Sequence, residues 1–436
     1  MKNAREEDRL NGKTLYIPPM CAGTVELFCG AMRALGVDAR PSPASDERTR
    51  ELAARHCTGD ECYPQLVTLG DFLKVTEAPS FEPARTALFI PKTGGPCRFG
   101  QYNELVRTVL DKNGFADVAI ISPTCENGYR DLGKNGPEMM HYAWWAIVAG
   151  DLLRKALLRT RPYELEKGTT DAVYQRCVNE MAEVLARPDR LGRVKFSDLK
   201  KGLRECRNRF AQIAANYREE RLLVGISGEI FCRLNTFSND DMARKIEQYG
   251  GEAWVADMSE WIYYSNYWEM EEIRTFANPV SLKMLGAWLS NRVQQRNEHE
   301  LSGLFASMLV GWEEPHDIRE IVERGAKYLD PHAGMGEMIL NLGKASWLHE
   351  KGADGMVDIS PFSCMNGIIS QSIYPKVSQD LDGLPIRSFY FDGTQTNLDE
   401  DVGIFMELAA NYSRNKRYPR ALPGYFNSPG HNRNAA

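Results

Sequence analysis

The sequence predicts an α/β protein with two lobes, each built around a parallel sheet, and a helical segment that joins them. In two stretches, residues 13–137 and 221–412, short apolar runs of strand length alternate with segments of helical periodicity. The stretch between them, residues 138–220, has helical periodicity almost throughout. A chain of 436 residues is also too long for one ordinary hydrophobic core. We therefore expect these three segments, followed by a polar tail at 413–436.

The first lobe is expected to hold strands and helices in alternation. The apolar run RTALFIP, which ends at Pro91, is its clearest strand, and Pro64 suits the first turn of a helix. Because strands that alternate with helices pair in parallel, the loops after the strands meet at one edge of the sheet. The predicted strands cover 13–20, 37–42, 85–91 and 116–123, and the predicted helices cover 24–35, 45–55, 65–75 and 101–112.

The second lobe repeats the alternation. The segment ALFIPKTGGPC before a helix of the first lobe parallels GMVDISPFSC before a helix of the second. Each lobe is thus expected to carry a strand whose end delivers one thiol at a helix start. The predicted strands cover 221–226, 252–256, 355–360 and 385–391, and the predicted helices cover 240–249, most of 279–352, the segment after Cys364, and 398–412.

Composition excludes several classes of function. The formal net charge of −6 argues against nucleic-acid binding, which needs a concentrated basic surface. No apolar run reaches the ~18 residues of a membrane helix, and the charged N-terminus lacks the apolar core of a signal peptide. We therefore expect a cytoplasmic protein that binds neither nucleic acid nor a membrane.

Ten cysteines are many for a chain in a reducing compartment. In that setting, Cys in Gly- and Pro-rich loops indicates metal ligation or catalysis before it indicates a disulfide. Cys177 and Cys206 lie in helical, charged patterns, and we expect them to be buried or incidental thiols. The candidate ligands lie in turn-like sequence or just after a strand: Cys57, Cys62, Cys97, Cys125, Cys232 and Cys364.

The spacing of these cysteines favours an iron–sulfur cluster over zinc. A cluster needs thiolates on loops that also donate backbone N–H groups to sulfur, and a helix N-terminus supplies such donors. Structural zinc sites usually use C-x2-C hooks, whereas four residues separate Cys57 from Cys62 and the chain has no C-x2-C. Two alternatives stay open, namely unliganded loop thiols and redox chemistry of the Cys57–Cys62 pair. For Cys232, a buried strand end is weighed equally with ligation.

Four separated motifs resemble the 2-hydroxyacyl-CoA dehydratase superfamily. They are CTGDECYPQLVTLGDFLK, FIPKTGGPCRFGQYNELVRTVLDKNG, GISGEIFCRLN and GADGMVDISPFSCMNGII, in this order. The pattern is most similar to the cluster-binding domain of acyl-CoA dehydratase activase-related proteins, whose relatives include benzoyl-CoA reductase subunits and double-cubane cluster proteins. The resemblance spans most of residues 13–412. It implies Rossmann-like lobes with a cysteine-ligated cluster in the cleft between them.

The resemblance also implies ligands and partners. In order of preference, the implied ligands are Cys62, Cys97 and Cys364, then Cys57 and Cys125, then Cys232. The electrons would come from a separate ATP-dependent iron–sulfur activator or reductase, since this chain has no P-loop. The number of loop cysteines allows a [4Fe–4S] cubane or a double-cubane [8Fe–9S] cluster. A homodimer, or a heterodimer with a related cluster subunit, is what the relatives imply.

We therefore expect an iron–sulfur oxidoreductase or electron-transfer subunit of anaerobic metabolism, with no catalytic residue assigned. Two alternatives stay open: radical dehydration of a 2-hydroxyacyl-CoA, and a non-enzymatic cluster carrier that docks to a related protein. An acyl-CoA substrate would be expected to meet cationic groups in the cleft.

For a few side chains near the cysteines, the sequence suggests two possible roles each. Arg98 and the turn at 225–228 suit a phosphate or a CoA tail, while a loop ion pair is the other reading for the arginine. Ser227 and Glu229 suit substrate binding or acid–base chemistry, although such residues at strand ends often bond the backbone. His56 suits proton transfer, or is a solvated loop residue.

Overall fold

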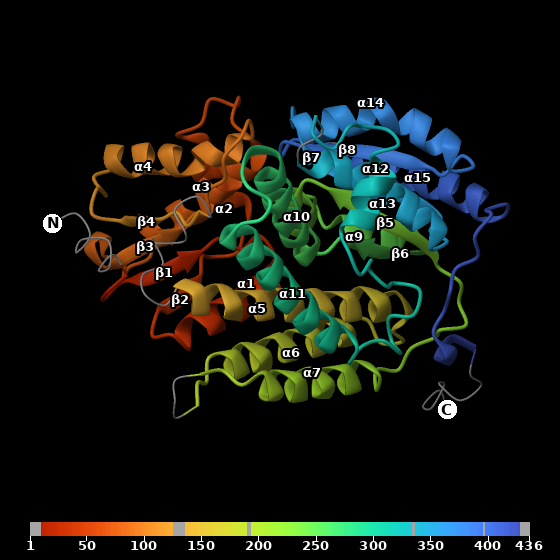
Figure 1. Cartoon of the computed structure of the whole chain (residues 1–436), viewed down its shortest axis with the longest axis horizontal. Coiled ribbons are helices and arrows are strands. Elements are labelled where there is room, and N and C mark those ends of the chain that lie inside the picture. Colours follow the sequence, from red (N-terminus) through yellow and green to blue (C-terminus); the bar gives the residue numbers. More distant parts are fainter. Residues whose placement is uncertain (1–9, 125–135, 190–192, 334–335, 396, 428–436) are drawn as a thin grey trace. The chain divides into compact units, whose positions relative to one another are not determined.

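The α/β class is confirmed by two sheets of four parallel strands each. The computed structural model describes residues 10–124, 136–189, 193–333, 336–395 and 397–427. The chain divides into two compact units, and Figure 1 labels the helices and strands. Unit 1 comprises Met1–Ile147 and Val178–Gly202, and unit 2 comprises Val148–Cys177 and Leu203–Ala436.

The first sheet belongs to unit 1 and has the strand order β2-β1-β3-β4. The strands and helices alternate as predicted. The strands are β1 (Thr14–Ile17), β2 (Asp38–Pro41), β3 (Thr86–Phe89) and β4 (Ala119–Ile121). The α-helices are α1 (Ala22–Arg33), α2 (Glu47–Ala54), α3 (Tyr63–Thr76) and α4 (Tyr102–Lys112), with short 3-10 helices η1 (Pro83–Arg85) and η2 (Arg98–Gln101).

Two details of this sheet follow from local chemistry. Pro64 lies in the first turn of α3, as predicted, where its missing N–H leaves no helical hydrogen bond unmade. β4 is shorter than the predicted 116–123, because it is an edge strand that pairs with β3 over three residues only.

Helices cover both faces of the first sheet. On one face Leu69 and Phe72 of α3 and Val106 of α4 pack in one hydrophobic cluster with Leu88 of β3. On the other face Phe28 of α1 contacts the ring of Phe89, with 5.6 Å between the ring centroids. The first sheet is therefore covered by helices on both of its faces.

Helices α2 and α3 pack unusually closely at Gly70. A Cβ atom added at Gly70 would lie 2.0 Å from the carbonyl oxygen of Thr49 on α2, so only glycine fits there. Beside this contact the buried carboxylate of Asp71 accepts hydrogen bonds from the hydroxyls of Ser45 and Thr49, both at 2.7 Å. The pair of helices holds the CTGDECYP loop between them, since α2 ends just before Cys57 and α3 begins just after Cys62.

Because Asp71 is buried, we expect the free energy of unfolding to depend on pH. Burial raises the pKa of Asp71 far above the usual range of a carboxyl group, to about 7. The folded state therefore holds a proton that the unfolded chain has lost, so the stabilisation present below pH about 4 disappears as the pH rises to about 7. We expect Asp71→Asn to remove a pH-dependent contribution on the order of 3–4 kcal/mol from urea unfolding curves. Asp111→Asn on α4, which is exposed, is the control and should leave the slope unchanged; an unchanged slope in Asp71→Asn contradicts the prediction.

Three long helices follow the first sheet in the chain. They are α5 (Gly136–Thr160), α6 (Thr169–Leu185) and α7 (Phe196–Phe210), with the 3-10 helix η5 (Arg161–Tyr163). Each has residues in both units. The helical periodicity predicted for 138–220 is thus observed.

The second sheet belongs to unit 2 and has the strand order β6-β5-β7-β8. It is built from β5 (Leu222–Gly228), β6 (Gly251–Val255), β7 (Gly355–Pro361) and β8 (Ile386–Phe391). The helices are α8 (Ile230–Leu234), α9 (Met242–Gln248), α10 (Met258–Phe276), α11 (Leu282–Ser302), α12 (Arg319–Gly325), α13 (Glu337–Glu350), α14 (Met365–Asp380) and α15 (Leu398–Ser413), and η6 (Gly424–Asn427) is a 3-10 helix.

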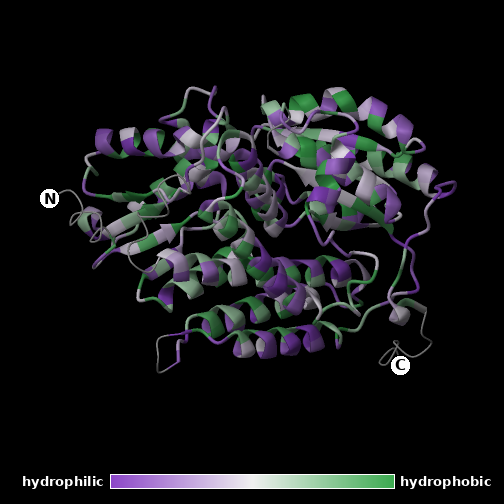
Figure 2. Ribbon diagram, in the orientation of Figure 1, coloured by the Kyte–Doolittle hydropathy of each residue, from purple (hydrophilic) through white to green (hydrophobic). Residues whose placement is uncertain are grey.

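Glycines let helices lie close on both faces of the second sheet. A Cβ at Gly225 would lie 2.1 Å from a methyl group of Leu348 on α13, whereas one at Gly355 would lie 2.8 Å from the ring of Phe405 on α15. Successive residues of a strand face opposite ways, so α13 and α15 cover opposite faces (Figure 1). Outer helices such as α14 alternate hydrophilic and hydrophobic residues along their length (Figure 2).

The strand orders place the candidate loops. In each sheet the chain connections leave the two central strands, β1 and β3 or β5 and β7, toward opposite sides. Ligands of open parallel sheets bind at this point, outside the carboxyl ends of the strands.

Across the described residues, no helix is long and apolar enough to cross a membrane.

Candidate functional site

The CTGDECYP loop of unit 1 is held by its own glutamate. The Glu61 carboxylate accepts hydrogen bonds from the backbone N–H groups of Thr58 at 2.9 Å and Gly59 at 3.0 Å. Partial burial raises the pKa of Glu61, but the hydrogen bonds from these N–H groups outweigh burial and hold the pKa below its usual value. Gly59 has φ +98°, a conformation that side chains rarely adopt, which explains the glycine at this turn.

The two thiols of this loop lie at helix ends. Cys57 follows α2 and is half-buried; burial, and then the charge of Glu61, raise the pKa of its thiol to about 11. Cys62 is the N-cap residue of α3. The partial positive charge of a helix N-terminus favours a thiolate at such a position.

The loop of Cys97 contacts the CTGDECYP loop. Cys97 is exposed and precedes the 3-10 helix η2. The neighbouring Arg98 donates a hydrogen bond of 2.6 Å from Nη1 to the carbonyl oxygen of Asp60, midway between Cys57 and Cys62. Phe99 packs on the same hydrophobic cluster as Cys57 and Cys62. Three of the predicted ligands are therefore carried by two loops that are in contact.

Two predicted ligands belong to unit 2, and they lie after β5 and β7, the two central strands of its sheet. Cys364 is the N-cap residue of α14, and the backbone N–H groups of Gly367 and Asn366 point at its sulfur. Burial, and then the charge of Glu229, raise the pKa of the Cys364 thiol to about 12. Cys232 is fully buried in α8. Cys125 lies outside the described residues.

Two buried carboxyl groups lie beside Cys364. Glu229 is the N-cap of α8 and accepts hydrogen bonds from the backbone N–H groups of Phe231 at 3.0 Å and Cys232 at 2.8 Å. Burial, and then the charge of Glu337, raise the pKa of Glu229 to about 7. Glu337 accepts a hydrogen bond from the side chain of Asn366. Glu229 thus forms hydrogen bonds with the backbone, which is the second of the two roles that the sequence suggested for it.

Arg233 ties the ends of the neighbouring strands together. Its guanidinium donates to the carbonyl oxygen of Gly228 at 2.9 Å and to that of Asp257 at 3.1 Å. Gly228 ends β5 and Asp257 follows β6, so one buried side chain fixes both loops. Ser227, beside Gly228, is bonded to Asn341 of α13 at 2.7 Å.

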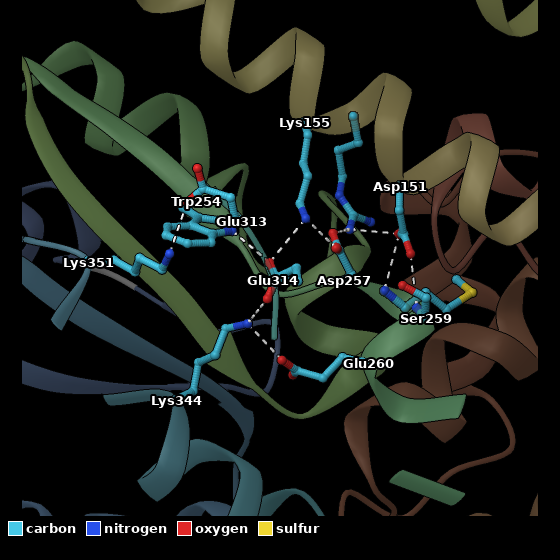
Figure 3. A network of polar contacts seen from close by, with 12 residues as sticks. Asp151, Lys155, Trp254, Asp257, Ser259, Glu260, Glu313, Glu314, Lys344 and Lys351 are labelled. Carbon is cyan, nitrogen blue, oxygen red and sulfur yellow. Dashed lines mark hydrogen bonds and ion pairs between the residues drawn. The ribbon is translucent and has the colours of Figure 1, made fainter. Parts of the chain in front are cut away.

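A network of buried charges supports this edge of the second sheet (Figure 3). Lys155 of α5 pairs with Asp257 at 2.5 Å and with Glu314 at 3.1 Å. Lys344 of α13 pairs with the same Glu314 at 2.5 Å and with Glu260 of α10 at 2.7 Å. Despite burial, Lys155 and Lys344 lower the pKa of Glu314 to about 2. Glu314 therefore links α5 to α13, and Lys344 extends the link to α10.

The network also fixes the start of α10. Asp151 of α5 accepts hydrogen bonds from the backbone N–H groups of Met258 at 3.2 Å and Ser259 at 2.9 Å, which satisfies the first turn of that helix. Further along α10, Tyr264 is buried and its hydroxyl oxygen accepts a hydrogen bond from the backbone N–H of Gly336 at 3.2 Å. Packing is the role observed for this tyrosine.

The donor chemistry of the thiols fits an iron–sulfur cluster. Thiols at helix starts and N–H groups aimed at the Cys364 sulfur are the features such clusters use. Within the described part of the chain, no group of three or more His, Cys, Asp or Glu side chains forms a site that could hold a metal ion. The assignment of ligands therefore stays a prediction, as does one cluster shared by both lobes.

Comparison with models of protein families and with curated proteins found no match. The superfamily resemblance of the four motifs thus remains a prediction.

Several residues of unit 2 that lie beside these loops were not predicted from the sequence. Glu337 received no chemistry, and Arg233, Asn341 and Asn366 were not singled out. The available signal was their position, since Arg233 follows a predicted ligand directly and Asn366 comes two residues after another.

Proposed function

We propose that the chain is an iron–sulfur protein that receives low-potential electrons from a separate ATP-dependent reductase and uses them in a difficult reduction or passes them on. The observation that carries the proposal is the hydrogen bond between Arg98 and Asp60, which joins the loop of Cys97 to the loop of Cys57 and Cys62. Three thiols on two touching, glycine-containing loops suit cluster ligation better than isolated core thiols.

The residues that would hold the cluster are Cys62, Cys97 and Cys364, which the motifs rank first, and then Cys57, whose loop also carries Cys62. When bound, the cluster supplies one-electron transfer at low potential. The chain itself contributes the backbone donors. The N–H groups of Gly367 and Asn366 already point at the Cys364 sulfur, and such hydrogen bonds tune the potential of a cluster.

The raised thiol pKa values are compatible with ligation. Without a metal, burial keeps the thiols of Cys57 and Cys364 protonated at neutral pH. A bound cation reverses this preference, because a coordinating thiol is deprotonated outright. Cluster binding should therefore release protons, and reconstitution should be more efficient at higher pH.

Iron and sulfide content tests the proposal. The full chain, purified without oxygen, should be brown and contain iron and sulfide in several-fold molar excess, with an EPR signal after reduction. Each of Cys62→Ala, Cys97→Ala and Cys364→Ala is expected to lose most of the iron. Cys177→Ala, which removes a fully buried thiol of α6, is the control and should keep it. Colourless protein that contains only zinc would refute the proposal.

The same preparation separates the alternative activities. A change in the EPR signal on addition of a 2-hydroxyacyl-CoA would indicate a dehydratase. Turnover of small molecules without that change would favour the oxidoreductase. Inertness to both, with tight binding to a related chain, would indicate a cluster carrier.

A further inference from the structure

Helices α6 and α7 form an antiparallel hairpin, and contacts fix it at both ends. Just before α6, Glu164 forms an antiparallel β-bridge with Ala215, which follows α7. Toward the other end, a Cβ atom added at Gly202 of α7 would lie 2.6 Å from the sulfur of Met181 on α6. The start of α6 therefore lies beside the end of α7, and the two helices stay in contact up to Gly202.

One helical turn from the contact at Gly202, each helix carries a cysteine. Cys206 follows Gly202 by four residues, and Cys177 precedes Met181 by four residues. Residues four apart lie on the same side of a helix. Because the helices are antiparallel, both steps lead the same way along the hairpin, so Cys177 and Cys206 face each other. Both are buried, as the sequence suggested, with 0% and 1% of their surface exposed.

The spacing of packed helices suits a disulfide between these two residues. The axes of helices in contact lie ~8–10 Å apart, and Cα atoms lie ~2.3 Å from each axis. Cα atoms that face each other directly are therefore about 3.5–5.5 Å apart, and disulfides join Cα atoms at ~4.4–6.8 Å. The three atoms nearest to a Cβ at Gly202 all belong to α6, so the helices touch here with nothing between them.

We propose that Cys177 and Cys206 are a redox-modification site, at which a small disulfide such as oxidised glutathione converts the two thiols into a disulfide that joins α6 to α7. One protein thiolate attacks a glutathione sulfur, which releases one glutathione thiolate and leaves a mixed disulfide. The second protein thiolate attacks the protein sulfur of that mixed disulfide, and the second glutathione thiolate leaves. The protein loses two electrons to glutathione, and the two thiol protons pass to the released thiolates.

Burial of both thiols controls the rate of this reaction. Glutathione is too large to reach a fully buried sulfur, so exchange requires a transient separation of α6 from α7. Oxidation of the folded protein is therefore slow, and reduction of the finished disulfide is slow for the same reason. In a reducing compartment the disulfide forms when the glutathione pool becomes oxidised, which is how a redox-sensing pair behaves. The proposal does not depend on the presence of a cluster.

Equilibration of the full chain with glutathione buffers tests this proposal. The chain is incubated at several ratios of oxidised to reduced glutathione, the remaining thiols are blocked with N-ethylmaleimide, and the peptides are identified by mass spectrometry. A peptide that links Cys177 to Cys206 is expected. Its equilibrium constant should be roughly 100-fold larger in native buffer than in concentrated urea, because the fold favours a disulfide by the factor by which that disulfide stabilises the fold.

A thiol moved by one turn is the matched control. In Cys177→Ala with Met181→Cys, the thiol lies ~5.4 Å further along α6, opposite Gly202 and too far from Cys206 for a disulfide. This variant should lose the preference for native buffer. Circular dichroism and the unfolding midpoint should show that it is folded. Cys177→Ala with Val178→Cys, which turns the thiol ~100° around α6, is a second control with the same expected result.

Three results would each overturn the proposal. The first is an equilibrium constant that is no larger in native buffer than in urea. The second is that Cys177 and Cys206 remain thiols, or carry only glutathione, at every ratio. The third is a folded control variant whose new thiol links to Cys206 as strongly as Cys177 does, since motion of the helices and not their register would then bring the thiols together.

Discussion

Glu314→Ala is expected to lower the free energy of unfolding by about 3–5 kcal/mol. The carboxylate of Glu314 pairs with Lys155 and Lys344 and accepts the indole N–H of Trp254 at 3.0 Å. Its removal leaves two buried ammonium groups with one carboxylate each, and leaves the indole N–H of Trp254 without this acceptor. Removing one partner of a buried ion pair costs far more than the pair itself contributes, because the remaining charge stays desolvated.

The neighbouring residue provides the control for this measurement. Glu313 pairs with Lys351 at 2.9 Å, and the two side chains are 53% and 27% exposed. Exposed pairs contribute about 0–1 kcal/mol, so Glu313→Ala should change urea unfolding, followed by circular dichroism, by no more than that. Equal effects of the two substitutions would show that the Glu314 network does not behave as a buried one.

Gly70→Ala is expected to destabilise unit 1 by roughly 3 kcal/mol and to reduce its capacity for iron. The new Cβ atom would lie 2.0 Å from the carbonyl oxygen of Thr49, and a backbone oxygen cannot move without separating α2 from α3. These helices end and begin at the loop of Cys57 and Cys62, so their separation changes the positions of both thiols. The loss exceeds the gain of about 1 kcal/mol that alanine brings to a helix interior.

Gly286→Ala on α11 is the control for the helix propensity alone. A Cβ atom added at Gly286 meets no atom within 4 Å, so the substitution should stabilise the chain slightly or leave it unchanged. The measurements are the unfolding midpoint and the iron content of anaerobically prepared protein. A Gly70→Ala variant as stable as the unmodified chain would show that α2 and α3 tolerate separation.

Much of the fold could be predicted from the sequence because the signals are local. Apolar runs such as the one that ends at Pro91 have strand length, and glycines follow some of the helices, as Gly36 follows α1 and Gly114 follows α4. Pro64 predicted a helix start because its ring fits only the first turn. The thiols predicted at helix starts were Cys97 and Cys364. Cys364 is the N-cap residue of α14, whereas Cys97 precedes the 3-10 helix η2, which leads into α4.

The contacts of the site depend on tertiary packing and could not be predicted. Arg98 reaches Asp60 across 38 residues of sequence, and Glu229 interacts with Glu337 from a different helix. No local pattern reports such pairs.

The shared strand order puts equivalent loops at equivalent places in the two units. Numbered within its own unit, each sheet runs second, first, third, fourth. The strand order therefore reverses between the first and third strands in both sheets, where ligands of open parallel sheets bind. By position β3 corresponds to β7, and the next cysteine after each strand, Cys97 or Cys364, directly precedes a helix. A ligand that binds beside the third strand would meet one thiol in each unit.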